Sequence, residues 1–164
     1  MNPEIKLQFF VPGTPVPKGS AKAFYVKKLN RAIVTQDNRE KQKPWASMIS
    51  VMAQNSMAGR MVCKGAVKID VTFVFARPKS HYRIGKNSHL LRENAPADHI
   101  VKPDRDKLLR CVLDALKPIV YEDDCQTNDG NTKKVYGDNP GAHIHVTFNE
   151  GGPINNTNQK ELPL

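Results

Sequence analysis

Long apolar runs are missing from this sequence, and their absence excludes a broad class of protein. No window of about 18 consecutive apolar residues occurs, which is the length that a helix needs to cross a bilayer. The first residues also lack the basic-then-apolar order of a signal peptide. We therefore expect a cytoplasmic protein with no membrane-spanning segment.

Cysteine is scarce as well, which bears on metal binding and on redox state. The chain has three cysteines, Cys63, Cys111 and Cys125, and no two of them form a Cys-x-x-Cys pair. An odd number of cysteines with this spacing favours reduced thiols in a cytosolic protein. The same spacing argues against a zinc site.

Acidic residues are outnumbered by basic ones, which indicates the kind of partner. The chain has 16 Asp and Glu against 25 Lys and Arg, a net charge of +9. Such a surface favours a polyanion, most often nucleic acid, although many small proteins are basic for solubility alone. The 164 residues, 39% of them hydrophobic, suit one domain with one ordinary core. We expect this domain over residues 1–150 and a disordered tail over residues 151–164, which are rich in Asn, Gly and Pro.

The hydrophobic periodicity predicts both strands and helices. Alternating apolar residues predict strands at 5–11, 67–75, 132–136 and 142–148, and a short hairpin strand at 32–34. Helical spacing predicts helices over 39–58 and 106–117. Proline is best tolerated in the first turn of a helix, so Pro44 predicts a start near Lys43. Residues 11–20 and 77–102 are expected to be irregular loops.

Basic residues gather in and beside these loops, and their positions predict a surface for DNA. A long cationic loop within a small domain is typical of nucleic-acid binding. The predicted DNA-binding residues are Lys18, Lys22, Lys27, Lys28, Arg77, Lys79, Arg83, Lys86, Lys102, Lys133 and Lys134.

The few acidic residues are concentrated in one region. Five Asp and one Glu lie between Lys102 and Gln126. A local acidic cluster is useful to a basic protein if it holds a divalent cation that the basic surface alone would repel. A surface that holds phosphates, next to carboxylates that hold Mg²⁺, is the arrangement of a metal-dependent nuclease.

Three of these carboxylates are candidate metal ligands. Asp104 and Asp106 are two residues apart, so in extended chain their side chains lie on one side, just before a predicted helix. Either could cap that helix instead, but capping needs only one. We favour Asp124 as the third ligand, because the chain after the helix is long enough to return towards the helix start. A solvated acidic turn is the alternative. Oxygen ligands alone favour Mg²⁺ or Mn²⁺ over zinc.

Other charged residues lie around these ligands. Asp106, Arg110 and Asp114 are four apart and share one helix face. Arg110 could neutralise a phosphate or the charge that develops in the transition state, or it could form an ion pair with one of these two Asp residues. We interpret Asp114 as a partner of Arg110, and Asp123 as a neighbour of the metal ligand Asp124, rather than as metal ligands themselves.

These motifs resemble the RusA family of Holliday-junction resolvases of bacteria and their phages. The family pattern is Asp-x-Asp-Asn-Leu-x-Lys, then Asp-Ala-Leu, then Asp-Asp-x-Gln. This chain reads Asp104-Arg-Asp106-Lys-Leu108-Leu-Arg110, then Asp114-Ala-Leu116, then Asp123-Asp124-Cys-Gln126. The segments Val11-Pro-Gly-Thr-Pro-Val-Pro-Lys18 and Arg77-Pro-Lys-Ser-His-Tyr82 also look like phage members, so the similarity runs from about Phe9 to Phe148.

The resemblance implies a fold and an activity. The fold would be an α+β two-layer sandwich, a small mixed sheet packed by two main helices, acting as a homodimer. The activity would be Mg²⁺-dependent cleavage of four-way DNA junctions by paired nicks, in DNA recombination and repair, with Mn²⁺ as a substitute. The protein would act in a bacterial cytoplasm and be encoded by a phage or prophage.

The resemblance also assigns catalytic residues. Asp104, Asp106 and Asp124 fall on the family's catalytic carboxylates. Lys107 replaces the usual Asn, and Arg110 lies where the family has a catalytic Lys. Arginine keeps the charge but is not an equivalent proton donor. Either Arg110 stabilises charge at this position, or Lys107 supplies an ammonium from the neighbouring one.

Two other functions remain open at this point. The first is a non-catalytic DNA-binding protein with structural carboxylates. The second is a nuclease that acts on other branched DNA, such as flaps, forks or phage branch points before packaging. All three functions require phosphate contacts, so charge alone does not separate them.

Overall fold

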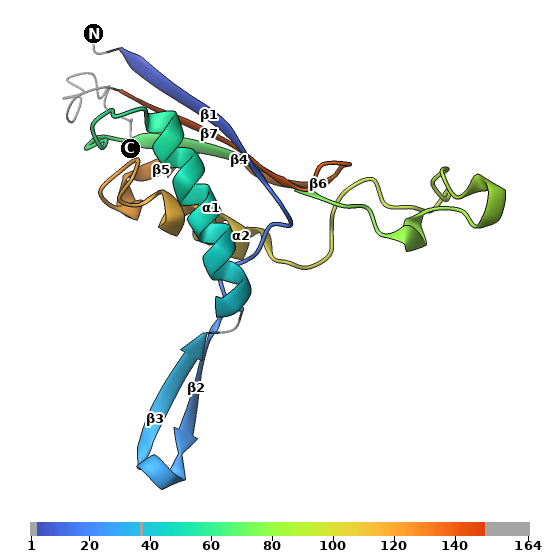
Figure 1. The fold of residues 1–164 in the computed structure, drawn as a ribbon, viewed down its shortest axis with the longest axis horizontal. Coiled ribbons are helices and arrows are strands. Elements are labelled where there is room, and N and C mark those ends of the chain that lie inside the picture. Colours follow the sequence, from blue (N-terminus) through green and yellow to red (C-terminus); the bar gives the residue numbers. More distant parts are fainter. Residues whose placement is uncertain (1–2, 37, 150–164) are drawn as a thin grey trace, which may run out of the picture.

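Two helices pack on one face of a five-stranded mixed sheet in the computed structural model, which describes residues 3–36 and 38–149 (Figure 1). The helices are α1 (Arg39–Met57) and α2 (Arg105–Leu116). The strands are β1 (Glu4–Pro12), β2 (Ala21–Val26), β3 (Arg31–Gln36), β4 (Val67–Phe75), β5 (Thr127–Asp129), β6 (Thr132–Tyr136) and β7 (Gly141–Asn149). The predicted two-layer α+β fold is confirmed. No helix within the described ranges is long and apolar enough to cross a membrane.

The sheet is built around β4 and β7. β7 pairs antiparallel with both β1 and β4, and the short strands β5 and β6 pair parallel with β4. In this register Val146 lies opposite both Leu7 and Ile69, so apolar side chains of three strands meet on one face. The other face carries polar residues such as His143 and His145, as their alternation predicted.

Both helices bury one side against this apolar face. The buried residues are Trp45, Ile49, Ala53 and Met57 of α1, and Leu108, Cys111, Val112, Ala115 and Leu116 of α2. Burying a large aliphatic side chain contributes roughly 1.5–3 kcal/mol, so these stripes hold the two layers together. The opposite side of α2 remains accessible, and it carries Asp106 and Arg110.

The helix boundaries required one correction. α1 begins at Arg39 rather than near Lys43, and Pro44 lies inside it. The amide of Gln42 donates to the carbonyl of Asn38 at 2.8 Å, so helical hydrogen bonds form before the proline is reached. A proline at this depth removes one hydrogen bond, and the buried stripe that follows outweighs that loss. The remaining predicted strands and α2 are confirmed to within about two residues.

Two segments project from the sheet and helices (Figure 1). One is the β2–β3 hairpin, whose turn is the 3-10 helix Lys27–Leu29. Sequence periodicity predicted its second strand in part and missed its first. The other, here called the arm, is residues 77–102. The arm was predicted to be irregular, but it contains two 3-10 turns and a bridge between Tyr82 and Leu91. The predicted tail, residues 151–164, lies outside the described residues.

Candidate active site and nucleic-acid interface

Asp104 occupies the residue position just before α2, where a side chain often caps the helix. Its backbone is extended (φ −69°, ψ 137°), yet its side chain makes no capping hydrogen bond. The carboxylate is about half exposed and lies 3.3 Å from the ammonium of Lys107. Asp106 follows in the first turn and is exposed. Capping therefore does not account for Asp104, and both carboxylates remain accessible to a ligand.

The segment leading to Asp104 is held by a lysine from the sheet. Lys134 of β6 donates to the carbonyls of Val101 and Pro103 at 2.7 and 2.8 Å. These hydrogen bonds fix the chain on both sides of Lys102 and immediately before Asp104. Lys134 was predicted to contact phosphate. The structure directs its ammonium to the backbone that positions Asp104.

The acidic turn after α2 is built around Gln126 and Tyr121. The Gln126 side chain accepts hydrogen bonds from the amides of Glu122 and Asp123, and donates to the carbonyls of Cys63 and Gly65, all at 2.8–2.9 Å. Tyr121 is fully buried, and its hydroxyl donates to the carbonyl of Leu113 at 2.7 Å. The Tyr121 bond holds the turn to α2, and the Gln126 bonds hold it to the segment before β4.

The Asp123 side chain forms contacts both within this turn and with the end of α2. Its carboxylate accepts from the amide of Cys125 at 3.1 Å and pairs with Lys117 at 2.8 Å. The hydrogen bond from Lys117, followed by that from the Cys125 amide, lowers the pKa of Asp123 to about 2. Asp123 therefore stays ionised at neutral pH and is engaged beside Asp124.

Asp124 has one carboxylate oxygen in an unusual environment. Its Oδ1 atom is buried and has no hydrogen-bond partner among residues 3–36 and 38–149. Leaving such an atom unsatisfied costs about 1–3 kcal/mol, so it normally has a partner or a functional reason. Its negative charge is also one of the causes that raise the pKa of Tyr121, after the larger effect of burial. A cation would satisfy this oxygen.

The three predicted metal ligands are not gathered at one point. No three His, Cys, Asp or Glu side chains in residues 3–36 and 38–149 lie close enough together to hold a metal ion. Asp104 and Asp106 start α2, whereas the turn of Asp124 is tied to Leu113 and Lys117 at its other end. A helix of 12 residues is about 18 Å long. The expectation that the chain returns Asp124 to the helix start is therefore corrected.

Asp104 and Asp106 still fit Mg²⁺ by their chemistry. In proteins Mg²⁺ is usually held by one or two carboxylates, substrate phosphates and water. Two accessible carboxylates at the start of α2 provide the protein's share of such a set. Asp124 offers an unsatisfied oxygen of the same kind, at a distance from them.

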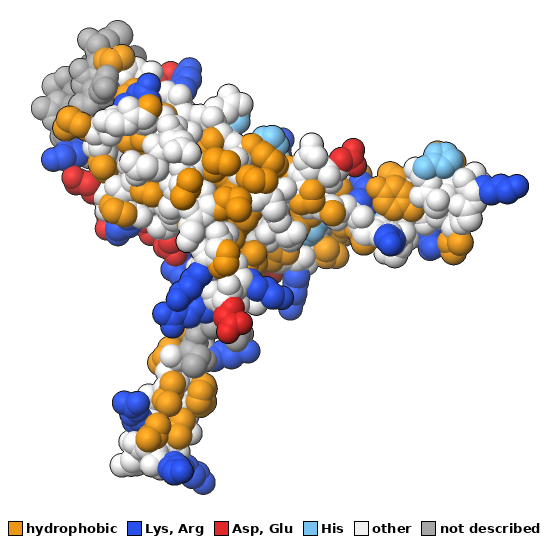
Figure 2. All heavy atoms as spheres, in the orientation of Figure 1, with side chains coloured by type: hydrophobic (Ala, Val, Ile, Leu, Met, Phe, Trp, Pro, Cys, Tyr) orange, Lys and Arg blue, Asp and Glu red, His pale blue; other side chains and the backbone are white. Residues whose placement is uncertain are grey.

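A basic groove runs beside Asp104, between the base of the hairpin and the starts of α1 and α2. It is formed by two adjoining cavities of about 1180 and 680 Å³ that share Lys18, Lys41 and Lys107 in their walls. Its other charged lining residues are Arg39, Glu40, Lys102, Asp104 and Arg110. Figure 2 shows Lys and Arg side chains gathered where the hairpin leaves the rest of the molecule. The groove therefore contains cationic side chains that can bind phosphate groups and a carboxylate that can bind a metal ion.

The groove is closed on one side by Lys18. Its backbone amide donates to the carbonyl of Lys107 at 3.0 Å, and its ammonium forms an ion pair with Asp114. Asp114 was expected to pair with Arg110. Since Lys18 takes that place, the part of the chain that the structure describes contains no ion pair of Arg110. The guanidinium therefore lines the groove with its charge available.

A comparison with known protein families decides the family. The model of the family described as "Endodeoxyribonuclease RusA" matches residues 12–147. The chain belongs to this family. It is also 26% identical over 143 residues to the uncharacterized protein YqaN of Bacillus subtilis (strain 168), covering 85% of this chain and 94% of that protein. The resemblance inferred from the motifs is thus confirmed over most of the chain.

Membership of the RusA family gives the motif residues a context. This family is one of endodeoxyribonucleases, so branched DNA is the implied kind of substrate and metal dependence the implied chemistry. The Gln that ends the acidic motif is Gln126, whose four hydrogen bonds explain why an amide is needed there. The motif did not reveal this structural role, because two of the four partners of Gln126, Cys63 and Gly65, lie 63 and 61 residues away in sequence.

The predicted DNA-binding residues of this RusA member divide into two groups. Arg77 packs over the ring of Tyr136 at 4.4 Å and donates to the carbonyl of Pro96, so like Lys134 it serves the base of the arm. The others line the groove or lie on the hairpin, the arm and β6: Lys18, Lys22, Lys27, Lys28, Lys79, Arg83, Lys86, Lys102 and Lys133. Arg39 and Lys41 also line the groove, although they were not among the predicted DNA-binding residues. The basic run at the start of α1 was the available signal.

Proposed function

We propose that this protein is a Mg²⁺-dependent, structure-selective endodeoxyribonuclease that resolves four-way DNA junctions by paired nicks. The supporting observation is the position of Asp104 in the wall of a basic groove, in a chain of the RusA family. The residues that we expect to hold the metal are Asp104 and Asp106, with Mn²⁺ as a substitute for Mg²⁺. When bound, the metal would polarise a phosphate and lower the pKa of a water molecule.

The groove residues would orient the phosphodiester for this chemistry. Lys41 and Lys102 would hold flanking phosphates, since both line the groove together with Asp104. Arg110, which pairs with no carboxylate in the described ranges, would stabilise negative charge as it develops on the scissile phosphate. Lys107 would keep Asp104 in place through their ion pair.

Asp124 is proposed as the third catalytic carboxylate of the DNA-bound protein. Its unsatisfied Oδ1 supports a role beyond the turn itself. Because its turn is tied to the end of α2 while Asp104 precedes the helix start, this role requires a rearrangement on binding DNA or a separate contact with substrate.

We propose that the protein acts as a homodimer. A four-way junction has near two-fold symmetry, and its resolution requires cuts on two opposing strands. Two identical active sites related by a two-fold axis match that geometry. A dimer also doubles the basic surface that faces the DNA.

One observation favours a second candidate function, a DNA-binding protein without catalysis. The Lys107 ammonium lies 3.3 Å from the Asp104 carboxylate, in a position to compete with a metal for that oxygen. A protein of this kind would bind junctions without Mg²⁺ and would never cut them.

The test is a gel assay on a synthetic four-way junction and a matched duplex, with Mg²⁺ or with EDTA. We expect symmetric nicks in the junction alone, abolished by EDTA. Tight junction binding without cutting under any divalent metal would establish the non-catalytic alternative. Flap and fork substrates in the same gel would show whether another branched DNA is cut more efficiently.

A further inference from the structure

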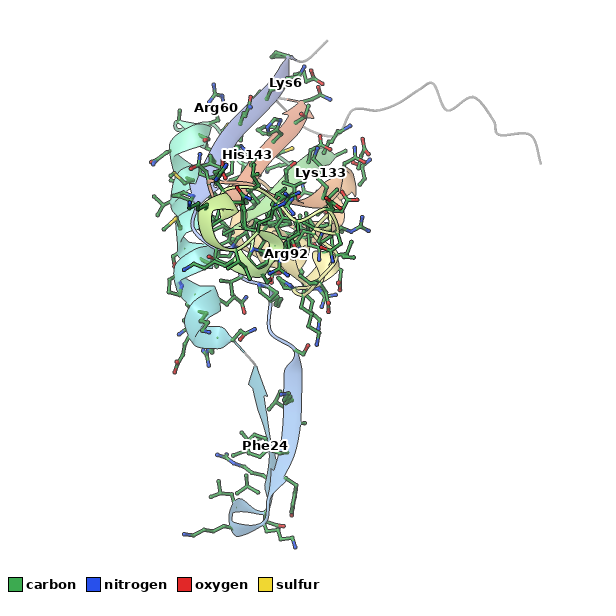
Figure 3. The ribbon with its side chains drawn as sticks, turned by 90° about the vertical axis from the view of Figure 1, so that its right-hand side faces the viewer. Lys6, Phe24, Arg60, Arg92, Lys133 and His143 are labelled. Carbon is green, nitrogen blue, oxygen red and sulfur yellow. The ribbon has the colours of Figure 1, made fainter. Side chains whose placement is uncertain are left out.

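The β2–β3 hairpin is an isolated two-stranded ribbon with exposed apolar side chains. Its strands pair with each other and with no other described strand. Phe24, Tyr25, Leu29 and Val34 are between 50% and 67% exposed. A hairpin of this kind is only marginally stable in water, and clustered exposed apolar side chains usually mark an interaction surface. Figure 3 shows Phe24 on the hairpin, at a distance from the sheet and helices.

The strand register separates the side chains of the hairpin into two faces. Phe24 lies opposite Ile33, and the next pair on the same face is Val26 with Arg31. Tyr25 lies on the other face, and its hydroxyl is hydrogen-bonded to Asn30. Phe24 is thus an exposed aromatic ring with a cation, Arg31, on its own face of the hairpin.

Charge indicates what binds to this hairpin. Between Lys18 and Gln36 the sequence has no Asp or Glu, while it has Lys18, Lys22, Lys27, Lys28 and Arg31. A second copy of this chain would bring a net charge of +9 towards the same cations. A polyanion is complementary to them. An aromatic ring among cations is the combination that binds nucleic acid where bases are open to stacking.

The hairpin also continues into the basic groove. Ser20, Ala21 and Val34, at its base, line the larger cavity together with Lys107 and Arg110. A DNA strand with a phosphate in the groove would therefore lie next to the hairpin. In plain duplex the bases near it are stacked and paired, whereas at a branch point they can be unstacked.

We propose that the hairpin enters the branch point of the DNA and that Phe24 stacks on a base there. This contact, rather than the cationic surface, provides the preference for branched DNA over duplex. The inference rests on the proposed function in taking branched DNA as the substrate.

The test compares Phe24→Ala with the wild-type protein in EDTA, so that no strand is cut. Binding is measured by fluorescence anisotropy on a four-way junction and on a matched duplex. We expect Phe24→Ala to lose about tenfold in junction affinity, the typical loss for one base stack, and less than about twofold on duplex. A junction with 2-aminopurine at the branch point should brighten on binding wild type, and most of that signal should disappear with Phe24→Ala.

Two further variants serve as controls. Phe24→Tyr keeps an aromatic ring and should retain junction affinity and the fluorescence change. Met61→Ala truncates a more exposed apolar side chain, 82% accessible and outside the hairpin, and should bind both DNAs as wild type does. Thermal melts of all three variants check that they are folded.

The possible failures can be told apart. Wild-type protein that neither binds nor cuts junctions would overturn the proposed function together with this inference. Wild-type cutting of junctions, with equal junction binding and fluorescence for Phe24→Ala, would overturn the inference alone. If sedimentation showed instead that Phe24→Ala separates a dimer into monomers while monomer affinity is kept, the hairpin would be a dimer contact, which also overturns it.

Discussion

At the scale of single residues, the acidic side chains around α2 differ in whether they already form an ion pair or hydrogen bond within the protein. Asp114 is paired with Lys18, and Asp123 with Lys117. Asp106 is exposed at the helix start, and Asp124 has a buried oxygen that no group in the described part of the chain hydrogen-bonds. The contacts of Asp106 and Asp124 within the protein therefore give no structural reason for a carboxylate at these positions. Binding a metal ion would provide one.

Replacing Asp106 with Asn should separate cleavage from binding. The variant loses a charged metal ligand, so we expect cleavage to fall by about a hundredfold or more. Junction binding in EDTA should be unchanged or tighter, because a negative charge near phosphate has been removed. Nicking assays and gel shifts measure the two effects. Asp138→Asn, an exposed aspartate in the turn before β7, is the matched control, and retained cutting by Asp106→Asn would refute the assignment.

Replacing Lys134 with Met should impair catalysis because Asp104 is displaced, rather than because a contact with DNA is lost. The variant loses two hydrogen bonds that fix the chain before Asp104. We expect unfolding free energy to fall by about 1–2 kcal/mol and cleavage by about tenfold. Lys133→Met removes the neighbouring exposed lysine and should weaken binding with little effect on the cleavage rate of bound junction. Equal behaviour of the two variants would contradict this distinction.

At the scale of elements, α2 and its flanking segments are arranged by hydrogen bonds to distant backbone. Lys18 closes the groove against α2, Lys134 holds the start of the helix, and Gln126 holds the turn beyond its end. The candidate catalytic motif is thus a helix whose two flanking segments are held by residues from outside it. Precise placement of the carboxylates depends on these contacts.

Replacing Gln126 with Ala should loosen the acidic turn. The change leaves four backbone groups without their partner, and at a net value of about 1 kcal/mol or less for each we expect a loss of about 2–4 kcal/mol in unfolding free energy. Urea unfolding measures this loss. Asn128→Ala, an exposed amide on β5, is the control and should cost little. A loss below that of the control would show that the turn is held mainly by Tyr121.

The base of the arm should respond to acid through His99. This side chain is 7% exposed, stacks on Phe75 at 4.2 Å and lies 4.9 Å from the ring of Tyr136, which Arg77 overlies. Burial, and secondly the charge of Lys134, lower the pKa of His99 below its usual value. The unfolded chain therefore takes up a proton at a higher pH than the folded one, so stability is lost as pH falls through the ordinary range of histidine.

Comparison of two histidine variants isolates this effect. His99→Phe should lessen the fall in melting temperature between about pH 7.5 and pH 5.5, because the side chain no longer titrates. His89→Phe replaces an exposed histidine of the arm and should keep the wild-type pH dependence. Identical pH dependence in all three proteins would mean that His99 is protonated equally in the folded and unfolded states.

At the scale of the whole molecule, the hairpin and the arm extend the basic surface well beyond the sheet and helices (Figure 1). Both carry lysines or arginines, and the groove with Asp104 lies where the hairpin meets the helices. Such a shape suits a large, branched polyanion better than a small ligand. It also leaves both projections open to contact with DNA.

Bound junction DNA should protect the arm from proteolysis. Trypsin can cut after Lys79, Arg83, Lys86 and Arg92, all of which lie in the arm. We expect these cuts to slow in the presence of junction, as measured by mass spectrometry of the fragments over time. Cuts within a sheet strand, after Lys68, serve as an internal control for general protection. Equal cleavage of the arm with and without junction would show that it stays away from DNA.

The sequence by itself determined the class of partner, the family and most of the secondary structure. Net charge follows from composition, and the strands and helices follow from side-chain periods of about two and 3.6 residues. The motif at Asp104 and Asp106 was readable because its members are neighbours in the chain. Such features depend on local geometry, which tertiary packing modifies only at boundaries, as at Pro44.

Only the tertiary structure decided which distant residues meet. It placed Asp124 at the far end of α2, paired Lys18 rather than Arg110 with Asp114, and directed Lys134 to the backbone before Asp104. Chain spacing does not determine such distances, because they depend on how buried groups such as Tyr121 dock on the core. Likewise, the sequence did not predict that the hairpin is exposed, because this depends on β2 and β3 pairing only with each other and not with the five-stranded sheet.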